Sequence, residues 1–194
     1  MALKEANLQP FAKPSTFPNP DRATAELSLQ PDVASALLAD WLPALAGMSA
    51  TLQAGARVAD VACGPGTSII RLAEAYPQSR YFGYDMSVAA IETARATALA
   101  SGVIERTYFQ IGSPADFPGW GYDLICFLNG VLGLPNPSGA AWRVQSSLSE
   151  NGVWLIAEAP GSEMAVKELT AAAGFTTCRC VLASSTDAVY EVRR

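Results

Sequence analysis

The chain has no histidine, and only 16% of its 194 residues are charged. The absence of histidine excludes zinc sites that need imidazole ligands and leaves acid–base chemistry to other side chains. The 13 Lys and Arg residues form no cluster and the net charge is −5, so a basic face for nucleic acid is not expected. No apolar stretch is long enough to span a membrane, and the N-terminus lacks a signal-peptide pattern. We therefore expect a cytoplasmic protein that binds neither nucleic acid nor a membrane.

Cysteines are few and have no metal-ligand spacing. Cys63 lies in a glycine-rich loop and Cys126 in an apolar run. Cys178 and Cys180 are two residues apart, so they share a face if this segment is a strand. We expect free thiols in a reducing compartment and no metal site.

Prolines divide the chain into two parts. The first part, residues 1–31, contains Pro10, Pro14, Pro18, Pro20 and Pro31, with Phe11 and Phe17 between them. Prolines at this density prevent a long helix or a central strand. We predict an N-terminal arm over 1–31 and one domain over 32–194. Our hypothesis is that Phe11 and Phe17 cover a substrate, either in the same molecule or across a homodimer.

Strands and helices alternate through the domain after a first helix over 32–45 that is interrupted near Pro43. Alternation of this kind predicts parallel strands joined by right-handed crossovers. The last two strands are separated only by a short turn, so they form an antiparallel hairpin. The prediction is an α/β, Rossmann-like, doubly wound and mostly parallel seven-stranded sheet. Its strands fall at 57–62, 81–84, 106–111, 122–128, 152–158, 175–183 and 188–194, with helices at 67–76, 87–100, 137–148 and 163–173.

A glycine-rich loop, residues 60–67, follows the first strand, where doubly wound sheets bind ligands. The dinucleotide fingerprint needs a third glycine where Ile69 stands, and a phosphate loop needs a lysine after Gly66. Asp60 would repel a pyrophosphate but suits an ammonium group. Asp85 ends the second strand, where a carboxylate can accept hydrogen bonds from a ribose diol. A ligand with an amino-acid end and a ribose end matches S-adenosylmethionine.

The run VADVACGPGTSIIRLAEAYPQSRYFGYDMSVAAIETAR resembles the cofactor half of class I S-adenosylmethionine-dependent methyltransferases. The segment LSENGVWLIAEA resembles the fifth strand of that family, and the resemblance covers roughly residues 52–194. It implies that the loop surrounds the methionine portion, that Asp85 holds the ribose and Met86 the adenine, and that Leu128 and Asn129 lie beside the sulfonium. The full set of cofactor residues so implied is Asp60, Ala62, Cys63, Gly64, Gly66, Asp85, Met86, Ser113, Pro114, Asp116, Phe117, Leu128 and Asn129.

Three features depart from the pattern of this family. Ser113 stands where the family often has an Asp that accepts from the adenine amino group, so a charge-assisted bond is given up. Similar bacterial relatives often carry a His-Asp pair after the fourth strand, where this chain has Leu132-Gly133 near the expected substrate. The insertion that covers the substrate in those relatives is also missing between Glu158 and the helix from Glu163.

Two functions therefore remain open from the sequence. The first is a methyltransferase that acts on O, N or C of a small molecule and releases S-adenosylhomocysteine. The second is a methyltransferase fold that binds S-adenosylmethionine or a small molecule without methyl transfer, as a cyclase, an isomerase or a non-catalytic partner. Fold alone does not decide between them. The sequence identifies no catalytic residue. We interpret Trp41, Trp120, Trp142 and Trp154 as packing residues and Asp123 as structural.

Overall fold

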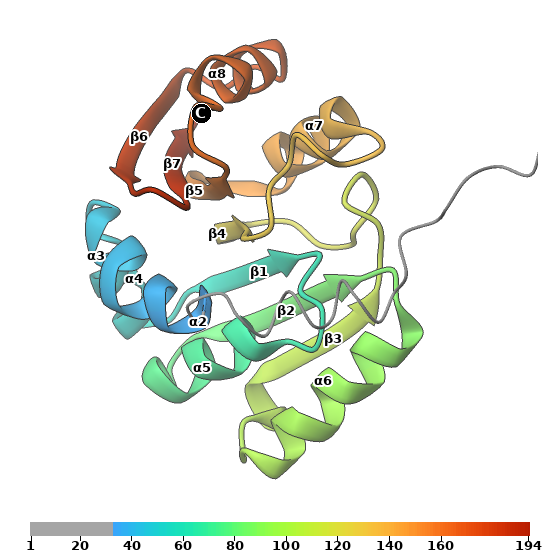
Figure 1. Cartoon of the computed structure of the whole chain (residues 1–194). Coiled ribbons are helices and arrows are strands. Elements are labelled where there is room, and N and C mark those ends of the chain that lie inside the picture. Colours follow the sequence, from blue (N-terminus) through green and yellow to red (C-terminus); the bar gives the residue numbers. More distant parts are fainter. Residues whose placement is uncertain (1–32) are drawn as a thin grey trace, which may run out of the picture. The chain divides into compact units, whose positions relative to one another are not determined.

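The structure is a computed structural model, and it describes residues 33–194. Seven strands form one sheet in the order β3-β2-β1-β4-β5-β7-β6 (Figure 1). All neighbouring pairs from β3 to β5 are parallel, and β7 is antiparallel to both β5 and β6. The predicted fold class is confirmed. The strands are β1 (Arg57–Val61), β2 (Arg80–Asp85), β3 (Thr107–Ile111), β4 (Tyr122–Phe127), β5 (Leu148–Glu158), β6 (Thr177–Ala183) and β7 (Ala188–Arg193).

Helices cover both faces of this sheet. They are α2 (Val33–Ala36), the π-helical turn η1 (Leu37–Trp41), α3 (Leu42–Ala44), α4 (Met48–Ala54), α5 (Thr67–Ala75), α6 (Val88–Ala100), the 3-10 turn η2 (Ile104–Arg106), α7 (Pro137–Ser147) and α8 (Glu163–Ala172). Over residues 33–194 no single helix has the length and apolar character to cross a membrane; only the bent pair Val33–Ala44 and Met48–Ala54 passes when taken together.

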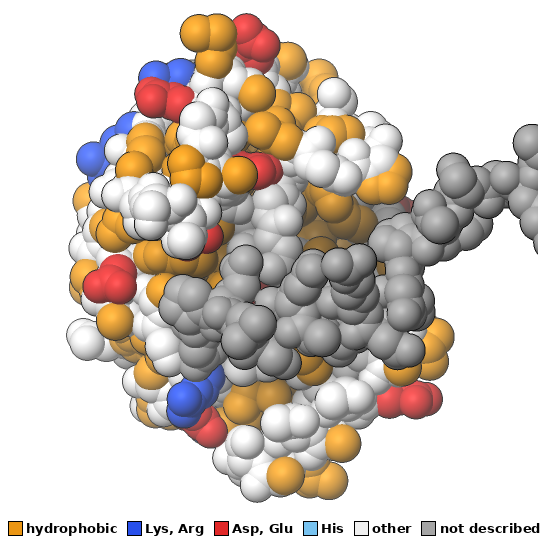
Figure 2. Space-filling model, viewed as in Figure 1, with side chains coloured by type: hydrophobic (Ala, Val, Ile, Leu, Met, Phe, Trp, Pro, Cys, Tyr) orange, Lys and Arg blue, Asp and Glu red, His pale blue; other side chains and the backbone are white. Residues whose placement is uncertain are grey.

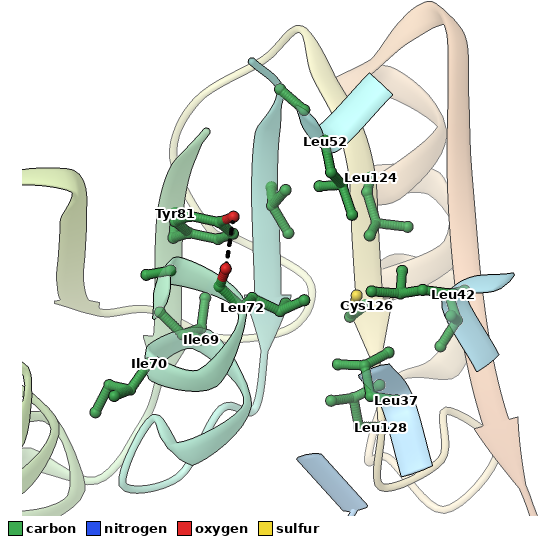
Figure 3. Packing of buried hydrophobic residues seen from close by; sticks show 14 of the residues in the cluster. Leu37, Leu42, Leu52, Ile69, Ile70, Leu72, Tyr81, Leu124, Cys126 and Leu128 are labelled. Atoms are coloured by element: carbon green, nitrogen blue, oxygen red, sulfur yellow. Dashed lines mark hydrogen bonds between the residues drawn. The ribbon is translucent and has the colours of Figure 1, made fainter. Parts of the chain in front are cut away.

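Alternating strand residues divide the core into two layers. One layer packs α2 to α6 against one face of the sheet, and the other packs α7 and α8 against the opposite face. Figure 3 shows the first layer, where Leu37 and Leu42 approach Cys126 and Leu128, and where the Tyr81 hydroxyl donates to the Leu72 carbonyl over 3.0 Å. The helix layers fix the strands, so the loops at the carboxyl edge are held at both ends.

Several local expectations are confirmed and two are corrected. The Ser87 hydroxyl caps α6 by accepting from Ala90 N at 3.2 Å, and Gly174 follows α8 with a φ of 89°. The helical backbone stops close to Pro43 as expected, since it ends at Ala44 and Leu45 is extended, but helix α4 was not predicted. The expectation for tryptophan was wrong at two positions. Trp41 and Trp154 are buried, whereas Trp120 and Trp142 are 78% and 59% exposed because both lie on surface segments.

Candidate functional site

The strand order reverses between β1 and β4, and doubly wound sheets form a ligand crevice beyond the carboxyl ends of the strands at such a point. β1 leads into the glycine-rich loop, and β4 leads into the segment from Leu128 to Asn136. Carboxyl-bearing residues stand at this edge on three strands: Asp60 on β1, Asp85 at the end of β2 and Glu158 at the end of β5. The topology thus brings acidic residues to one edge of the sheet.

Backbone hydrogen bonds shape the glycine-rich loop. Cys63 N donates to the Tyr84 carbonyl at 3.0 Å, and Gly66 N donates to the Cys63 carbonyl at 3.0 Å. Gly66 has a φ of 76°, and a Cβ at this residue would lie 2.5 Å from the Phe109 ring, so only glycine fits. Among residues 33–194, Ala62 is the one non-glycine residue with a positive φ, at 61°. The turn therefore holds alanine in a conformation that glycine adopts at lower cost.

Asp85 connects this loop to β2. Its Oδ2 accepts from Gly64 N at 2.8 Å, and its Oδ1 accepts from Ser87 N at 2.8 Å. A carboxylate offers about four acceptor positions, so each oxygen retains capacity for a further donor. The side chain is half-buried at the strand end. Asp85 thus both fixes the turn into α6 and can accept from a diol.

Asp60 is a buried carboxyl, with only 3% of its surface exposed. Among the residues that the structure describes, none makes a hydrogen bond to this carboxyl. Burial, and secondarily the charge of Asp85, raises the pKa of Asp60 from 3.8 to about 8. The ligand-free site therefore holds Asp60 protonated near neutral pH. A cationic ligand group would favour the ionised carboxylate, which fits the ammonium end of an amino acid.

Neither cysteine of this region is suited to act as a nucleophile. Burial, together with the charges of Asp60 and Asp85, raises the pKa of the Cys63 thiol. Cys126 is fully buried, and burial also raises the pKa of its thiol. Thiolates, not thiols, are nucleophiles, so both cysteines remain unreactive at neutral pH.

The edge beside β2 and β3 presents exposed apolar side chains. Met86 is 69% exposed and Ile111 is 53% exposed, which leaves apolar surface that a flat aromatic ring could cover. Ser113 and Asp116 form an isolated bridge that folds the next loop, with Pro114 between them half-buried. Phe117 is fully buried, so its side chain supports the loop from below and does not border a ligand.

Arg143 of α7 anchors that same loop, a role that no sequence pattern indicated. Its guanidinium donates to the Phe117 carbonyl at 2.6 Å and to the Gly119 carbonyl at 2.8 Å, and it lies over the Phe117 ring. The loop from Gly112 to Gly121 is thereby tied to a helix on the other half of the sheet.

On the β4 side, Leu128 is 7% exposed, and Asn129 is exposed directly after it. Leu132 packs partly against the α7 and α8 layer, and its backbone N–H donates to Glu158 Oε1 at 2.7 Å. Sequence reasoning also missed Glu158 as a site residue. Its place as the last residue of a buried strand, like that of Asp85, was the signal that could have identified it.

The predicted cofactor residues thus come together from four strand ends, with the Phe117 side chain as the exception. Phe11 and Phe17 lie outside the described residues. Asp123 is structural as expected, because it accepts from Arg57 N and from the Ser149 hydroxyl. Among the described residues no cluster of three metal-ligating side chains occurs, and all four cysteines are free.

One groove lies away from this edge. It has a volume of about 620 Å³ and is lined by α6 and β3 residues, among them Arg95, Leu99 and Tyr108. The guanidinium of Arg95 already donates two hydrogen bonds to the Phe109 carbonyl within the protein. The groove is lined by no carboxylate and no thiol, so we do not assign it to catalysis. Figure 2 shows that Lys and Arg are sparse on the face seen in Figure 1 and lie toward its margin.

Comparison with known proteins agrees with this geometry. A family model described as a methyltransferase domain matches residues 52–191. The polyketide synthase ThaQ of Burkholderia thailandensis is 30% identical over 98 residues, which are 50% of this chain and 5% of that protein. The chain therefore spans a small fraction of that relative.

Solved structures share the fold at low identity. The N,N-8-amino-8-demethyl-D-riboflavin dimethyltransferase of Streptomyces davawensis has a TM-score of 0.67 at 20% identity, over 89% of this chain and 56% of that one. A TehB-like SAM-dependent methyltransferase of Corynebacterium glutamicum has a TM-score of 0.64 at 16% identity, over 89% and 93%. The [4+2]-cyclase SpnF has a TM-score of 0.57 at 20% identity, over 66% and 55%. Because the family model matches residues 52–191, most of the described domain, this chain belongs to the methyltransferase-domain family.

Proposed function

We propose that this protein is an S-adenosylmethionine-dependent methyltransferase that acts on a small molecule and leaves S-adenosylhomocysteine as product. The observation that carries the proposal is the buried Asp60 carboxyl, which has no hydrogen-bond partner among residues 33–194 and stands beside Asp85 at the strand-order reversal. A site with one carboxyl for an ammonium group and another for a diol fits this cofactor at both ends.

The residues have separate tasks in this proposal. Asp60 would hold the amino group, Asp85 the ribose, and Met86 and Ile111 the faces of the adenine. Ser113 would accept from the adenine edge, and Leu128 with Asn129 would border the methyl group. When bound, the cofactor supplies an electrophilic methyl group on a sulfonium. The chain's own contribution is largely to hold the acceptor in line with that group.

The acceptor must lose a proton if it is a neutral hydroxyl or amine. The chain contains no histidine to take it. Glu158 is the remaining carboxylate at this edge, since Asp60 and Asp85 are assigned to the cofactor and the thiols of Cys63 and Cys126 stay protonated. An acceptor that is already ionised needs no base at all.

The cellular setting is part of the same proposal. We propose a cytoplasmic protein that forms no complex with nucleic acid, in which residues 1–31 cover the site or the site of a second copy. The support is the sequence alone: the net charge of −5, the scattered Lys and Arg, and Phe11 and Phe17 within the proline-rich arm.

Isothermal titration calorimetry with S-adenosylmethionine and S-adenosylhomocysteine tests the proposal. We expect both to bind the full chain, and transfer of a labelled methyl group from S-adenosylmethionine to phenol, amine or β-dicarbonyl acceptors to follow. Failure of both ligands to bind would reject the proposal. Binding without any transfer would favour the second candidate, a cofactor-binding cyclase or partner protein, for which the shared fold of the [4+2]-cyclase SpnF is the specific support.

A further inference from the structure

Glu158 anchors the loop after β4 with one carboxylate oxygen and leaves the other without a partner. Its Oε1 accepts from Val131 N at 2.5 Å and from Leu132 N at 2.7 Å. Within residues 33–194 no group donates a hydrogen bond to Oε2. A Cβ at Gly130 would lie 3.0 Å from both oxygens, so the carboxylate lies directly against a residue with no side chain. The fold thus fixes the position of the half-buried Glu158 carboxylate through Oε1 and leaves Oε2 open to solvent.

Strand pairing places Glu158 at the edge of the crevice. β4 and β5 are parallel and their last pair is Phe127 and Ile156, so Glu158 at the end of β5 lies beside the segment that follows β4. Glu158 is on the same side of β5 as Ile156, which belongs to the layer under α7 and α8. Asp60 is on the opposite side of the sheet, because its neighbours Ala59 and Val61 belong to the α7 layer. Two carboxylates therefore border the same edge from opposite sides.

The surroundings of Glu158 define what could bind it. An ionised carboxylate only accepts hydrogen bonds, so its free oxygen attracts an O–H, an N–H or a cationic nitrogen and repels an anion. Leu132, which packs against the same layer as Ile156 and donates its backbone N–H to Glu158, supplies apolar surface next to the carboxylate. Over residues 128–136 there is no Lys or Arg that could receive an anionic ligand.

We propose that Glu158 is a specificity-determining residue, whose Oε2 receives the hydroxyl or amine group of an apolar acceptor and excludes anionic molecules. The role as acceptor site rests on the proposed function, whereas the binding itself does not. Glu158 would then orient the nucleophilic atom from the β4–β5 side of the crevice.

The variant Glu158→Gln distinguishes ligand binding by Oε2 from the hydrogen bonds through which Oε1 holds the loop after β4. The glutamine carbonyl can still accept from Val131 N and Leu132 N, but the second atom becomes a donor. Glu150→Gln is the matched control, because Glu150 is an exposed glutamate on the same strand. The probes are benzylamine, phenol and benzoate, titrated into ¹⁵N-labelled full-length protein with saturating S-adenosylhomocysteine. The readout is the amide resonances of Val131 and Leu132 in ¹H–¹⁵N NMR.

We expect benzylamine and phenol to shift both amides and benzoate to leave them unmoved. Glu158→Gln should bind benzylamine about tenfold more weakly or worse, with an unchanged melting temperature, and Glu150→Gln should match the wild type. Three results would overturn the inference. Benzoate could bind as tightly as benzylamine, Glu158→Gln could bind benzylamine as tightly as the wild type does, or neither benzylamine nor phenol could shift the two amides. The wild-type comparison of benzylamine with benzoate decides the question even if the variant does not fold.

The two proposals fail in distinguishable ways. If calorimetry detects no S-adenosylhomocysteine binding but benzylamine still shifts Val131 and Leu132, the proposed function fails and the Glu158 site stands. If S-adenosylhomocysteine binds and neither benzylamine nor phenol shifts the two amides, the proposed function stands and the Glu158 site fails.

Discussion

Protonation of Asp60 should be visible in the pH dependence of stability. Its pKa is about 8 in the folded protein against an ordinary value of 3.8, because burial disfavours the charged form. Between these values the unfolded chain has released the proton while the folded protein keeps it. Stability from this group is therefore fully present below pH 4 and is lost as the pH rises to 8. The free energy of unfolding should fall by up to about 1.4 kcal/mol per pH unit in this window.

The substitution Asp60→Asn removes the titrating group and keeps its shape. Urea unfolding at several pH values from 5 to 8.5 would compare the slopes. We expect the contribution of Asp60 to the slope to disappear, so that the variant gains stability over the wild type as the pH rises. Asp40→Asn is the control, since Asp40 is an exposed carboxylate on the same domain. Parallel slopes for wild type and Asp60→Asn would refute the assignment of a raised pKa.

The same group couples ligand binding to proton release. A cationic amino group beside Asp60 should favour the ionised carboxylate, so binding near pH 6.5 should release about one proton per ligand. Calorimetry of S-adenosylmethionine in buffers of different ionisation enthalpy measures that number. Asp60→Asn should release none and bind more weakly. Binding without proton release by the wild type would show that the amino group does not meet Asp60.

The remaining predictions concern other parts of the same site. Asp85→Ala should weaken S-adenosylhomocysteine binding about tenfold to a hundredfold in calorimetry, because a charged acceptor is lost; equal affinity in the folded variant would contradict the ribose assignment. Ala62→Gly should stabilise the protein by about 0.5–1 kcal/mol in urea unfolding, since relief of the positive φ exceeds the added freedom of the unfolded chain; a loss of stability would contradict that strain. Ser113→Asp should tighten adenosine binding, and weaker binding would mean that Ser113 does not face the adenine amino group. Deletion of residues 1–30 should reduce ligand affinity or turnover with little change in the melting temperature of the ligand-free protein. Unchanged affinity and turnover would mean that the arm does not contribute to the site.

Local pattern predicted the sheet because each strand carries its own apolar signal. The glycine-rich loop and Asp85 were predictable for the same reason, since the turn at Gly66 and the strand end at Asp85 lie close in sequence. Helix α4 was missed, because the seven residues Met48–Ala54 are too few to show a clear helical period. The exposure of Trp120 and Trp142 depends on tertiary packing, which residue type does not report.

Long-range contacts account for what the sequence did not predict in the site. The Glu158 carboxylate accepts a hydrogen bond from Val131, which is 27 positions away in the sequence, and the Arg143 guanidinium donates to Phe117, which is 26 positions away. The pKa of Asp60 depends on burial beneath several elements and on Asp85. None of these contacts, nor the burial of Asp60, produces a periodic pattern or a motif in the sequence, so only the folded structure shows them.

The reversal of strand order at β1 and β4 separates the residues proposed for the cofactor from those proposed for the acceptor. From the centre of the sheet the chain first builds outward through β2 and β3, and then returns to build outward through β4 and β5. The residues proposed for the cofactor fall mainly in the first half, and the acceptor-side residues Leu132 and Glu158 fall in the second. On the proposed function, insertions or substitutions in the loops after β4 and β5 would change the molecule that is modified, while the groups proposed to hold the methyl donor stay in place. An acceptor site transplanted from another family member would need to replace only these two loops, and helix α7 would mark the boundary of such an exchange, because its Arg143 also anchors the cofactor-side loop.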